Sequence, residues 1–514
     1  MSLMSDAVVA KLSVWEALKR DARLELAYHE KRLPFMVGAL AFLYFFLLSA
    51  KQFTWIFVSG DSGDWLAASK MWIAPQPYGN PLFVTFGHLI NTIMPQNLVV
   101  GMTVFGSCLA SAVTVAAVYM IVVRLTKSLS AAFVAALILT GSAIFLSQST
   151  VLSQYPLAVM FPTLALLFYV EDRRKLAVLM LGLGAATHIV VIVLAFLWFV
   201  AELYYGRWRE WAKLIPLFVV VGLLPYALTL WELNRASPQL LAGGPLSLQS
   251  ISNYLGSTGV VGTLAVLQFP VRAFQFTGFI VVSMGVALIP MFVGLKQKDV
   301  KGIALIWLTL MFVCWYYLTC IDPTTWHYLP WIMPFLAILA GIGVTRIAWK
   351  PAMKWVSVGA GCLIAANAVW LNAGVESQQN NKAERYLQDM MDLPDGSALV
   401  INRGGYEGLA FDYAFASRKK LVPIYLLLED HQDSPLYLNY NDWMRKEYGV
   451  EAVGTKAMIA EEQQKGVPVY VMRELVPGWQ LAIEQEAYNQ NFGKVVGVNW
   501  NVPVTSKISY QEVK

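Results

Sequence analysis

Charged side chains are scarce in this sequence. They make up 14% of its 514 residues, whereas a soluble protein carries about 25%. Hydrophobic residues reach 57%, and the mean hydropathy is +0.54. This composition excludes the ordinary soluble classes. It predicts a polytopic integral membrane protein whose spanning segments are helical, because an unpaired backbone is too costly inside lipid.

Cysteine is also rare, and all four cysteines lie in apolar runs: Cys108, Cys314, Cys320 and Cys362. No CxxC pair and no metal-ligand spacing occurs, so we interpret these thiols as core residues. A lysine-containing phosphate loop and a dinucleotide fingerprint are missing too, which argues against a nucleotide-sugar substrate. We expect no nucleic-acid partner, because the basic residues sit in short loops between apolar runs.

Long apolar runs fill the first three quarters of the chain, and each can cross a hydrocarbon core of about 30 Å. We predict membrane segments at about 34–57, 98–123, 130–147, 154–170, 176–203, 212–231, 277–295, 302–320, 326–347 and 355–373. Basic loops between spans are typical of the cytoplasmic side. The basic loops of this chain can all lie on that side only if segment 176–203 enters and leaves on the same face.

Segment 176–203 is too short for two full crossings, and Gly182, Gly184 and His188 interrupt its middle. We predict a re-entrant pair of short helices with its tip near His188, which brings the count to about 11 membrane segments. Irregular backbone at membrane depth must be buried in protein or line a cavity, so His188 should line a cavity. The alternative is one tilted helix with a buried, hydrogen-bonded histidine.

This topology divides the chain into three parts. Residues 1–33 form a cytoplasmic amphipathic segment before an uncleaved first anchor, and residues 34–375 form the membrane domain, with outer loops at about 58–97 and 232–276. Residues 376–514 hold 19 acidic against 14 basic residues. Alternating helix and strand patterns, among them a helix at about 380–392 and the strand "SALVI", predict an extracytoplasmic α/β domain there.

The first outer loop places Asp61 and Asp64 between an apolar span and Trp65. Ionisable residues at membrane depth indicate function by default; the alternative is a solvated loop or a helix cap. The stretch "WLAASKMW" that follows predicts an interfacial helix, and "APQPYGNP" predicts a rigid turn that lays the chain along the membrane surface.

Three stretches resemble one family. They are "GDSGDWLAASKMWIAPQPYGNPLFVTFGHL", "LSQSTVLSQYPLAVMFPTLALLFYVEDRRKLAVLMLGLGAATHIVVIVL" and "WHYLPWIMPFLAILAGIG". In order and topology they are similar to GT-C glycosyltransferases, particularly the protein O-mannosyltransferase-like branch. The sequence departs from that pattern at Asp64, where glutamate is common, at Asn80 in the turn, and at His327, where the family often has arginine.

The resemblance implies transfer of a sugar from a polyprenyl-phosphate donor to a hydroxyl of a protein, glycan or glycolipid. It also implies a site on the outer face of a bacterial inner membrane or the endoplasmic reticulum, and inversion at the anomeric carbon. A carboxylate must take the hydroxyl proton, and Asp61 is our candidate for this general base. Asp64 would orient Asp61, bind the acceptor or help Asp61 hold a divalent cation; the sequence points to no other cofactor.

The leaving group is a lipid phosphate, whose developing charge needs cations. The candidates for binding this phosphate or the substrate are Lys70, Arg272, His327, His188, Arg235 and, in the proline-rich turn, Tyr78. For the basic residues the alternative is an ordinary interfacial or structural role.

Other functions stay open at this point. A polymerase or ligase would use a diphosphate-linked donor, and a lipid or sugar transporter would show repeats or charges at the membrane midplane. A non-catalytic subunit of an envelope-assembly complex would tolerate replacement of both carboxylates.

Overall fold

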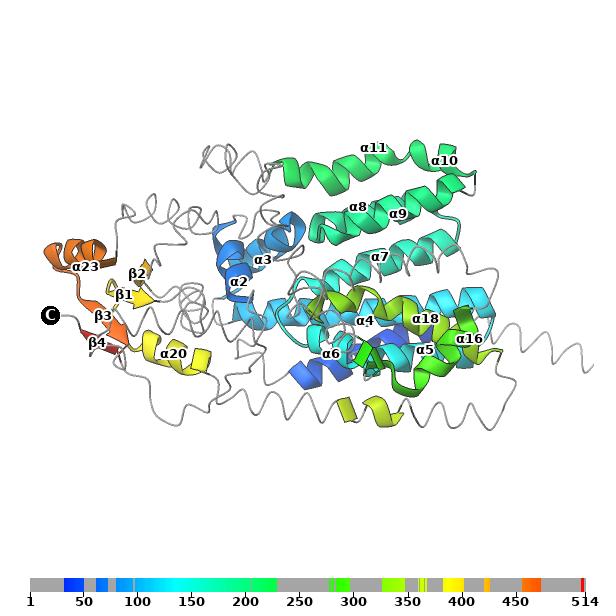
Figure 1. Ribbon diagram of the computed structural model, residues 1–514, viewed down its shortest axis with the longest axis horizontal. Helices are drawn as coiled ribbons and strands as arrows, with labels where there is room; N and C mark the ends of the chain where they lie inside the picture. The colour runs from blue at the N-terminus through cyan, green and yellow to red at the C-terminus, as the bar shows by residue number, and fades with distance from the viewer. Residues whose placement is uncertain are drawn as a thin grey trace, which may run out of the picture.

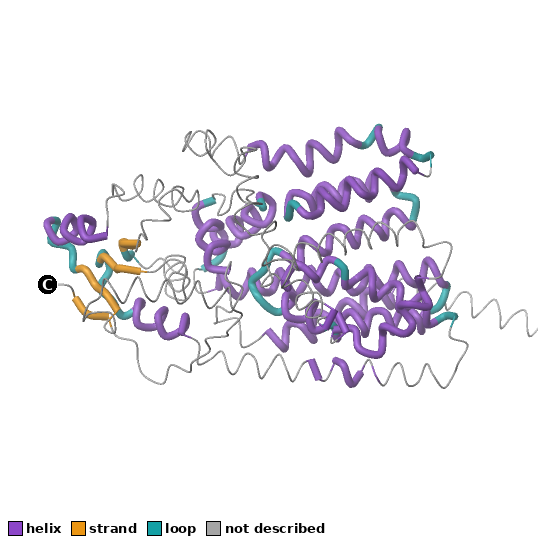
Figure 2. Tube along the Cα trace, viewed as in Figure 1, coloured by secondary structure: helices purple, strands orange, loops and turns teal. Residues whose placement is uncertain are grey.

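The computed structural model of the chain is mostly helical (Figures 1 and 2). It describes residues 32–49, 62–72, 80–95, 98–204, 206–228, 277–278, 280–281, 283–295, 326–346, 359, 361–364, 366–367, 382–401, 420–425, 455–472 and 510–512. Asp61, Tyr78, Arg235 and Arg272 lie outside these residues, as does the predicted segment 302–320. The predictions made for them therefore stay predictions.

Long apolar helices form a bundle around α4. The elements of the bundle are α4 (Val99–Thr126), α5 (Leu129–Gly141), α6 (Ala143–Ser149), α7 (Tyr155–Val170), α8 (Arg174–Thr187), α9 (Val190–Tyr204), α10 (Trp208–Ala212), α11 (Ile215–Phe218) with the π-helix η3 (Val219–Leu223), the short 3-10 helix η4 (Gly285–Ala287), α16 (Leu288–Leu295), the 3-10 helix η7 (Trp326–Trp331) and α18 (Met333–Val344). Helix α4 packs on α5, α7 and α18. At 28 residues it is about 42 Å long, enough to cross a bilayer.

Two of the described helices, Arg32–Ser49 and Val99–Thr126, are long and apolar enough to cross a membrane, and a third span results if the bent pair α5–α6 is counted as one. The chain is therefore an integral membrane protein.

The predicted span 130–147 is bent, because α5 and α6 meet at an angle of 66°. Ser142 ends α5 in an extended conformation and then caps α6, its hydroxyl accepting from the Phe145 N–H at 3.4 Å. The freed backbone groups find distant partners. The Gly141 carbonyl accepts from the Asn367 amide, and the Ile144 N–H donates to the Ser283 hydroxyl at 3.4 Å. A bend in a buried helix is tolerated when neighbouring helices satisfy its backbone in this way.

Segment 176–203 is a helix pair, as predicted, rather than one tilted helix. Helix α8 ends at Thr187, His188 is extended (φ −156°, ψ 133°), and α9 begins at Val190. The start of α8 and the end of α9 lie close together, because the hydroxyl of Tyr169, which precedes α8, donates to Glu202 near the end of α9 at 2.6 Å. Two collinear helices would hold these residues about 40 Å apart. Each helix is shorter than the roughly 20 residues of a full span.

Gly184 allows this turn. A Cβ at this position would lie 3.0 Å from Val191 of α9 and 3.2 Å from Phe161 of α7. Both contacts are tighter than ordinary van der Waals packing, so a side chain at this position would require Val191 or Phe161 to shift by a few tenths of an ångström.

A small sheet lies beyond the end of the bundle at which α2 (Ser62–Met71) and α3 (Pro81–Ile93) are found (Figure 1). Its strand order is β2-β1-β3-β4, with bounds β1 Ala398–Ile401, β2 Val422–Tyr425, β3 Val469–Met472 and β4 Tyr510–Glu512. Strand β1 pairs in parallel with β2 and β3, while β4 is antiparallel to β3. Helices α20 (Lys382–Met391) and α23 (Thr455–Gln464) accompany it. The predicted helix at 380–392 and strand 397–401 are confirmed.

Candidate functional site

The candidate site lies at one end of the bundle, where segments far apart in the sequence meet. Helix α3 packs on both α2 and α8, and η7 packs on α6 and α7. The turn at His188 and the start of α7 at Tyr155 lie at this same end. The predicted acidic loop, the predicted re-entrant tip and the segment of His327 are thus brought to one region.

Helix α2 confirms the helix that the sequence predicts in this stretch. It begins at Ser62, directly after Asp61, and Asp64 falls in its first turn. Trp65 is fully buried and packs edge-on against Phe83 of α3, with ring centroids 5.8 Å apart. Position 64 is one helical turn from Ala68, which is also buried. The helix therefore binds tightly to the bundle rather than lying as a solvated loop.

The proline-rich turn ends where α3 begins. Asn80 has a left-handed backbone (φ 40°, ψ 59°), and Pro81 occupies the first helical turn. Asparagine tolerates this conformation better than most residues, and proline suits the start of a helix. Lys70 lies half-buried in the last turn of α2, where a cation also interacts favourably with the helix dipole.

His188 is buried in an aromatic cluster. Its ring centroid lies 5.5 Å from that of Tyr155 and 4.7 Å from that of Trp331, and these two rings are 5.4 Å apart. The Val190 N–H donates to His188 Nδ1 at 3.3 Å, so the neutral imidazole carries its proton on Nε2. Trp331 is the last residue of η7, which also contains His327. The helix pair thus places His188 beside the segment of His327.

The sequence reading missed the partners of His188. Tyr155 and Trp331 are both almost fully buried, yet nothing in their local sequence separates them from ordinary membrane aromatics. A buried polar loop between α6 and α7 was missed as well. There Ser153 donates to Gln148 Oε1 at 2.9 Å, and Ser107 of α4 donates to the Ser153 carbonyl at 3.3 Å. The available signal was the run of polar residues in "SQSTVLSQ".

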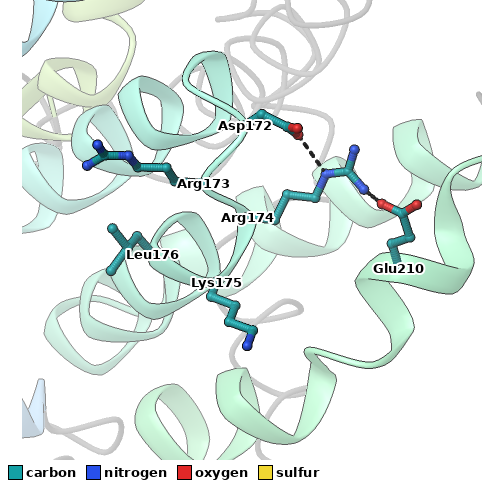
Figure 3. A pocket seen from close by; sticks show the side chains of 6 residues that line it. All are labelled: Asp172, Arg173, Arg174, Lys175, Leu176 and Glu210. Carbon is teal, nitrogen blue, oxygen red and sulfur yellow. Dashed lines mark hydrogen bonds and ion pairs between the residues drawn. The ribbon is translucent and has the colours of Figure 1, made fainter.

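An open pocket of about 630 Å³ lies at the turn between α7 and α8, and Figure 3 shows the side chains that line it. It is lined by Asp172, Arg173, Arg174, Lys175, Leu176 and Glu210. Arg174 is ion-paired with Asp172 at 3.1 Å and with Glu210, so these contacts join the α7–α8 turn to α10. None of the predicted site residues lines this pocket, and we assign it a structural role.

The base of the helix pair is clamped next to this pocket. Glu202 has a side chain that is only 3% exposed, and it accepts from Arg207 at 2.8 Å and from the Tyr169 hydroxyl at 2.6 Å. The Tyr169 ring packs against Trp198 and Trp211. These contacts hold the start of α8 and the end of α9 together. The turn of the pair, with His188, lies at the other end.

Among the residues that the structure describes, no group of three His, Cys, Asp or Glu side chains could hold a metal ion. A cation site built on Asp61 and Asp64 stays a prediction, because Asp61 lies outside the described residues.

Comparison with known proteins finds a matching family model and similar solved structures. Residues 61–212 match the family described as "Protein O-mannosyl-transferase TMEM260 N-terminal domain". A comparison with curated protein sequences finds no match. Among solved structures, the chain is similar to ArnT from Cupriavidus metallidurans in the apo state (TM-score 0.60) and bound to undecaprenyl phosphate (TM-score 0.58). In both cases the identity is 13%, over 88% of this chain and 94% of the other.

The family match covers α2, α3 and the helix pair of the candidate site but not η7, and the fold is similar to that of ArnT over 88% of this chain. The resemblance inferred from the sequence is thereby confirmed. Residues 61–212 are thus similar to the N-terminal domain of a protein O-mannosyl-transferase family, and the chain has a fold similar to that of ArnT.

Proposed function

We propose that this protein transfers a sugar from a polyprenyl-phosphate donor to an acceptor hydroxyl, with inversion at the anomeric carbon. The observation that carries the proposal is the extent of the family match, which begins at Asp61 and continues through the turn at His188. The similar fold of ArnT, determined with undecaprenyl phosphate, supports a lipid phosphate as the donor's carrier.

In the proposed reaction the acceptor oxygen attacks C1 of the sugar from the face opposite the phosphate. The bond between C1 and the phosphate oxygen breaks, and polyprenyl phosphate leaves with the electron pair. Asp61 takes the hydroxyl proton as the new bond forms, which is the work of a general base. Asp64 binds the acceptor or orients Asp61, since Asp64 lies in the first turn of α2 and this helix begins directly after Asp61.

The leaving phosphate develops charge that must be stabilised by positive or hydrogen-bond-donating groups. We assign this role to Lys70, His327 and Arg272, with Arg235 and Tyr78 as further contacts. His188 contributes as a neutral donor, because its Nδ1 accepts from Val190 and its proton therefore resides on Nε2. The short helix pair supports this assignment by carrying His188 to the end of the bundle where α2 and η7 lie.

We place this end on the outer face of the membrane. Of the described basic residues, Arg173, Arg174, Lys175 and Arg207 lie at the opposite end, and basic loops are cytoplasmic in most membrane proteins. On the outer face, a lipid-borne sugar and a water-borne hydroxyl can meet at the headgroup level. The sheet and helices α20 and α23 lie beyond the same end (Figure 1), and we assign them to acceptor recognition.

A donor panel tests this function. The purified protein is mixed with envelope extract and with either polyprenyl-phosphate or polyprenyl-diphosphate sugars, and the release of polyprenyl phosphate or diphosphate is measured together with the anomeric configuration of the product. We expect release from at least one monophosphate donor and a product of inverted configuration. Release from diphosphate-linked donors alone would reassign the protein to the polymerases and ligases. No release from any donor would contradict an enzymatic function.

A further inference from the structure

Helix α2 carries Asp64 and Lys70, yet it has only ten residues. A helix this short is marginal by itself. The last four carbonyls of any helix also lack partners within it. The position of Lys70, in the last turn, therefore depends on what satisfies these carbonyls and fixes the end of the helix.

His88 of α3 supplies that contact. Its Nδ1 lies 2.9 Å from the Ser69 carbonyl. A carbonyl can only accept, so the imidazole holds a proton on Nδ1 and donates it to the last turn of α2. His88 thus caps a different helix from its own, and it does so at the residue that directly precedes Lys70.

The end of α2 is fixed to α3 by a second residue. Trp72 leaves the helix with a positive φ of 55°, and its ring stacks flat on that of His88, with centroids 5.2 Å apart and an angle of 11°. Its indole Nε1 donates to the Thr85 hydroxyl at 3.2 Å. His88 is therefore held between the Ser69 backbone and the Trp72 ring, so its donor direction is set.

Close backbone approach makes this geometry rigid. Gly87 lies against Ser69, and a Cβ at Gly87 would fall 2.2 Å from the Ser69 hydroxyl. At the other end of α2, Trp65 is buried against Phe83 of α3. Helices α2 and α3 thus form one unit, with its contacts at Trp65, Ser69 and Trp72.

We propose that His88 is a positioning residue of the transferase site. Through its hydrogen bond to Ser69 it fixes the last turn of α2, and with it Lys70, for binding the phosphate of the lipid. This inference rests on the proposed function and deepens it, because it identifies what holds a phosphate-binding lysine in place. Other donors at the same position can replace His88 only if they present an N–H where Nδ1 stands.

Two amide replacements separate the donor from the bulk of the ring. An asparagine amide nitrogen comes closest to the position of Nδ1, whereas the longer glutamine presents its nitrogen near the position of Nε2. The measured quantity is the Kd of the full-length protein for undecaprenyl phosphate in detergent. We expect His88→Gln to raise this Kd about threefold to tenfold, the size of one net hydrogen bond. His88→Asn should stay within about twofold of wild type.

A matched control and a double-mutant cycle complete the test. Thr92→Ala removes a hydroxyl bond that stays within α3, to the His88 carbonyl at 2.8 Å, and should leave the Kd unchanged. If His88 acts through Lys70, His88→Gln should have little further effect in a Lys70→Ala background, because the two changes remove the same interaction.

Three results would overturn the proposal while leaving the transferase function intact. They are a wild-type Kd for His88→Gln, an equal loss for His88→Asn and His88→Gln, and a His88→Gln effect of full size in the Lys70→Ala background. A wild-type protein that binds no undecaprenyl phosphate would instead refute the proposed function, and this inference with it.

Discussion

The contact between Gly87 and Ser69 can be tested by adding a single methyl group. In Gly87→Ala the new Cβ would lie 2.2 Å from the Ser69 hydroxyl and 2.7 Å from the Ser69 Cβ. The hydroxyl can rotate away, but the Cβ cannot. Reaching an ordinary contact of 3.4 Å requires α2 and α3 to separate by about 0.7 Å.

A separation of this size has two consequences. It would lengthen the bond from His88 to the Ser69 carbonyl from 2.9 Å to about 3.6 Å, which is no longer a hydrogen bond. It would also cost about 1–3 kcal/mol of stability, as is typical of overpacked interiors. Alanine is a better helix former than glycine by about 1 kcal/mol, so the observed loss needs a control with the same backbone change.

Gly361 provides that control, because a Cβ there would meet nothing within 4 Å. We expect Gly361→Ala to be as stable as wild type or slightly more stable, and Gly87→Ala to be less stable than Gly361→Ala by about 1–3 kcal/mol. Thermal unfolding in detergent measures the difference. Adding Ser69→Gly to Gly87→Ala should recover most of it. Equal stability of the two alanine variants would refute the close packing of α2 on α3.

Three further predictions concern other contacts. Glu202→Ala should lower the free energy of unfolding by about 1–3 kcal/mol, because Tyr169 and Arg207 lose their shared acceptor. Glu202→Gln should lower it less. Equal melting temperatures of Glu202→Ala and wild type would contradict the role of Glu202 in holding the helix pair together. Asn367→Ala should destabilise by a similar amount, since the Gly141 carbonyl at the α5–α6 bend loses its donor, and a neutral result in thermal unfolding would contradict that account. Asp64→Asn should raise the KM for the acceptor, and EDTA should leave transfer unchanged if Asp64 binds the acceptor. Loss of transfer in EDTA and recovery with Mg²⁺ would instead assign Asp64 to a metal ion.

Local patterns were enough to predict several elements of this fold. The apolar spacing after Asp64 predicted α2, and the glycines around His188, together with the basic loops, predicted the helix pair. The amphipathic stretch near 380–392 predicted α20. In each case the signal lies in the segment itself or in the loops of the chain, as a periodicity, a breaker residue or a charge.

Other features could not be predicted because their causes lie far away in the chain. The run through Gly141 and Ser142 is apolar and continuous, and the bend there is held by Asn367 and Ser283. Strand β4 has only three residues and exists through its pairing with β3.

The same limit applies to the candidate site. The sequence singled out His188, but its contacts with Tyr155 and Trp331 arise only when α7, η7 and the helix pair assemble. His88 shows the same limit, because its role depends on the Ser69 carbonyl of another helix.

The most direct test of the account compares wild type with Asp61→Asn in a single-turnover transfer from a polyprenyl-phosphate sugar. Asparagine has the shape of aspartate but cannot accept the acceptor's proton. The account predicts a rate of transfer at least about a hundredfold lower in Asp61→Asn, the scale expected of a lost general base. The Kd for undecaprenyl phosphate should stay close to that of wild type. Equal rates of transfer would contradict the assignment of Asp61 as the base.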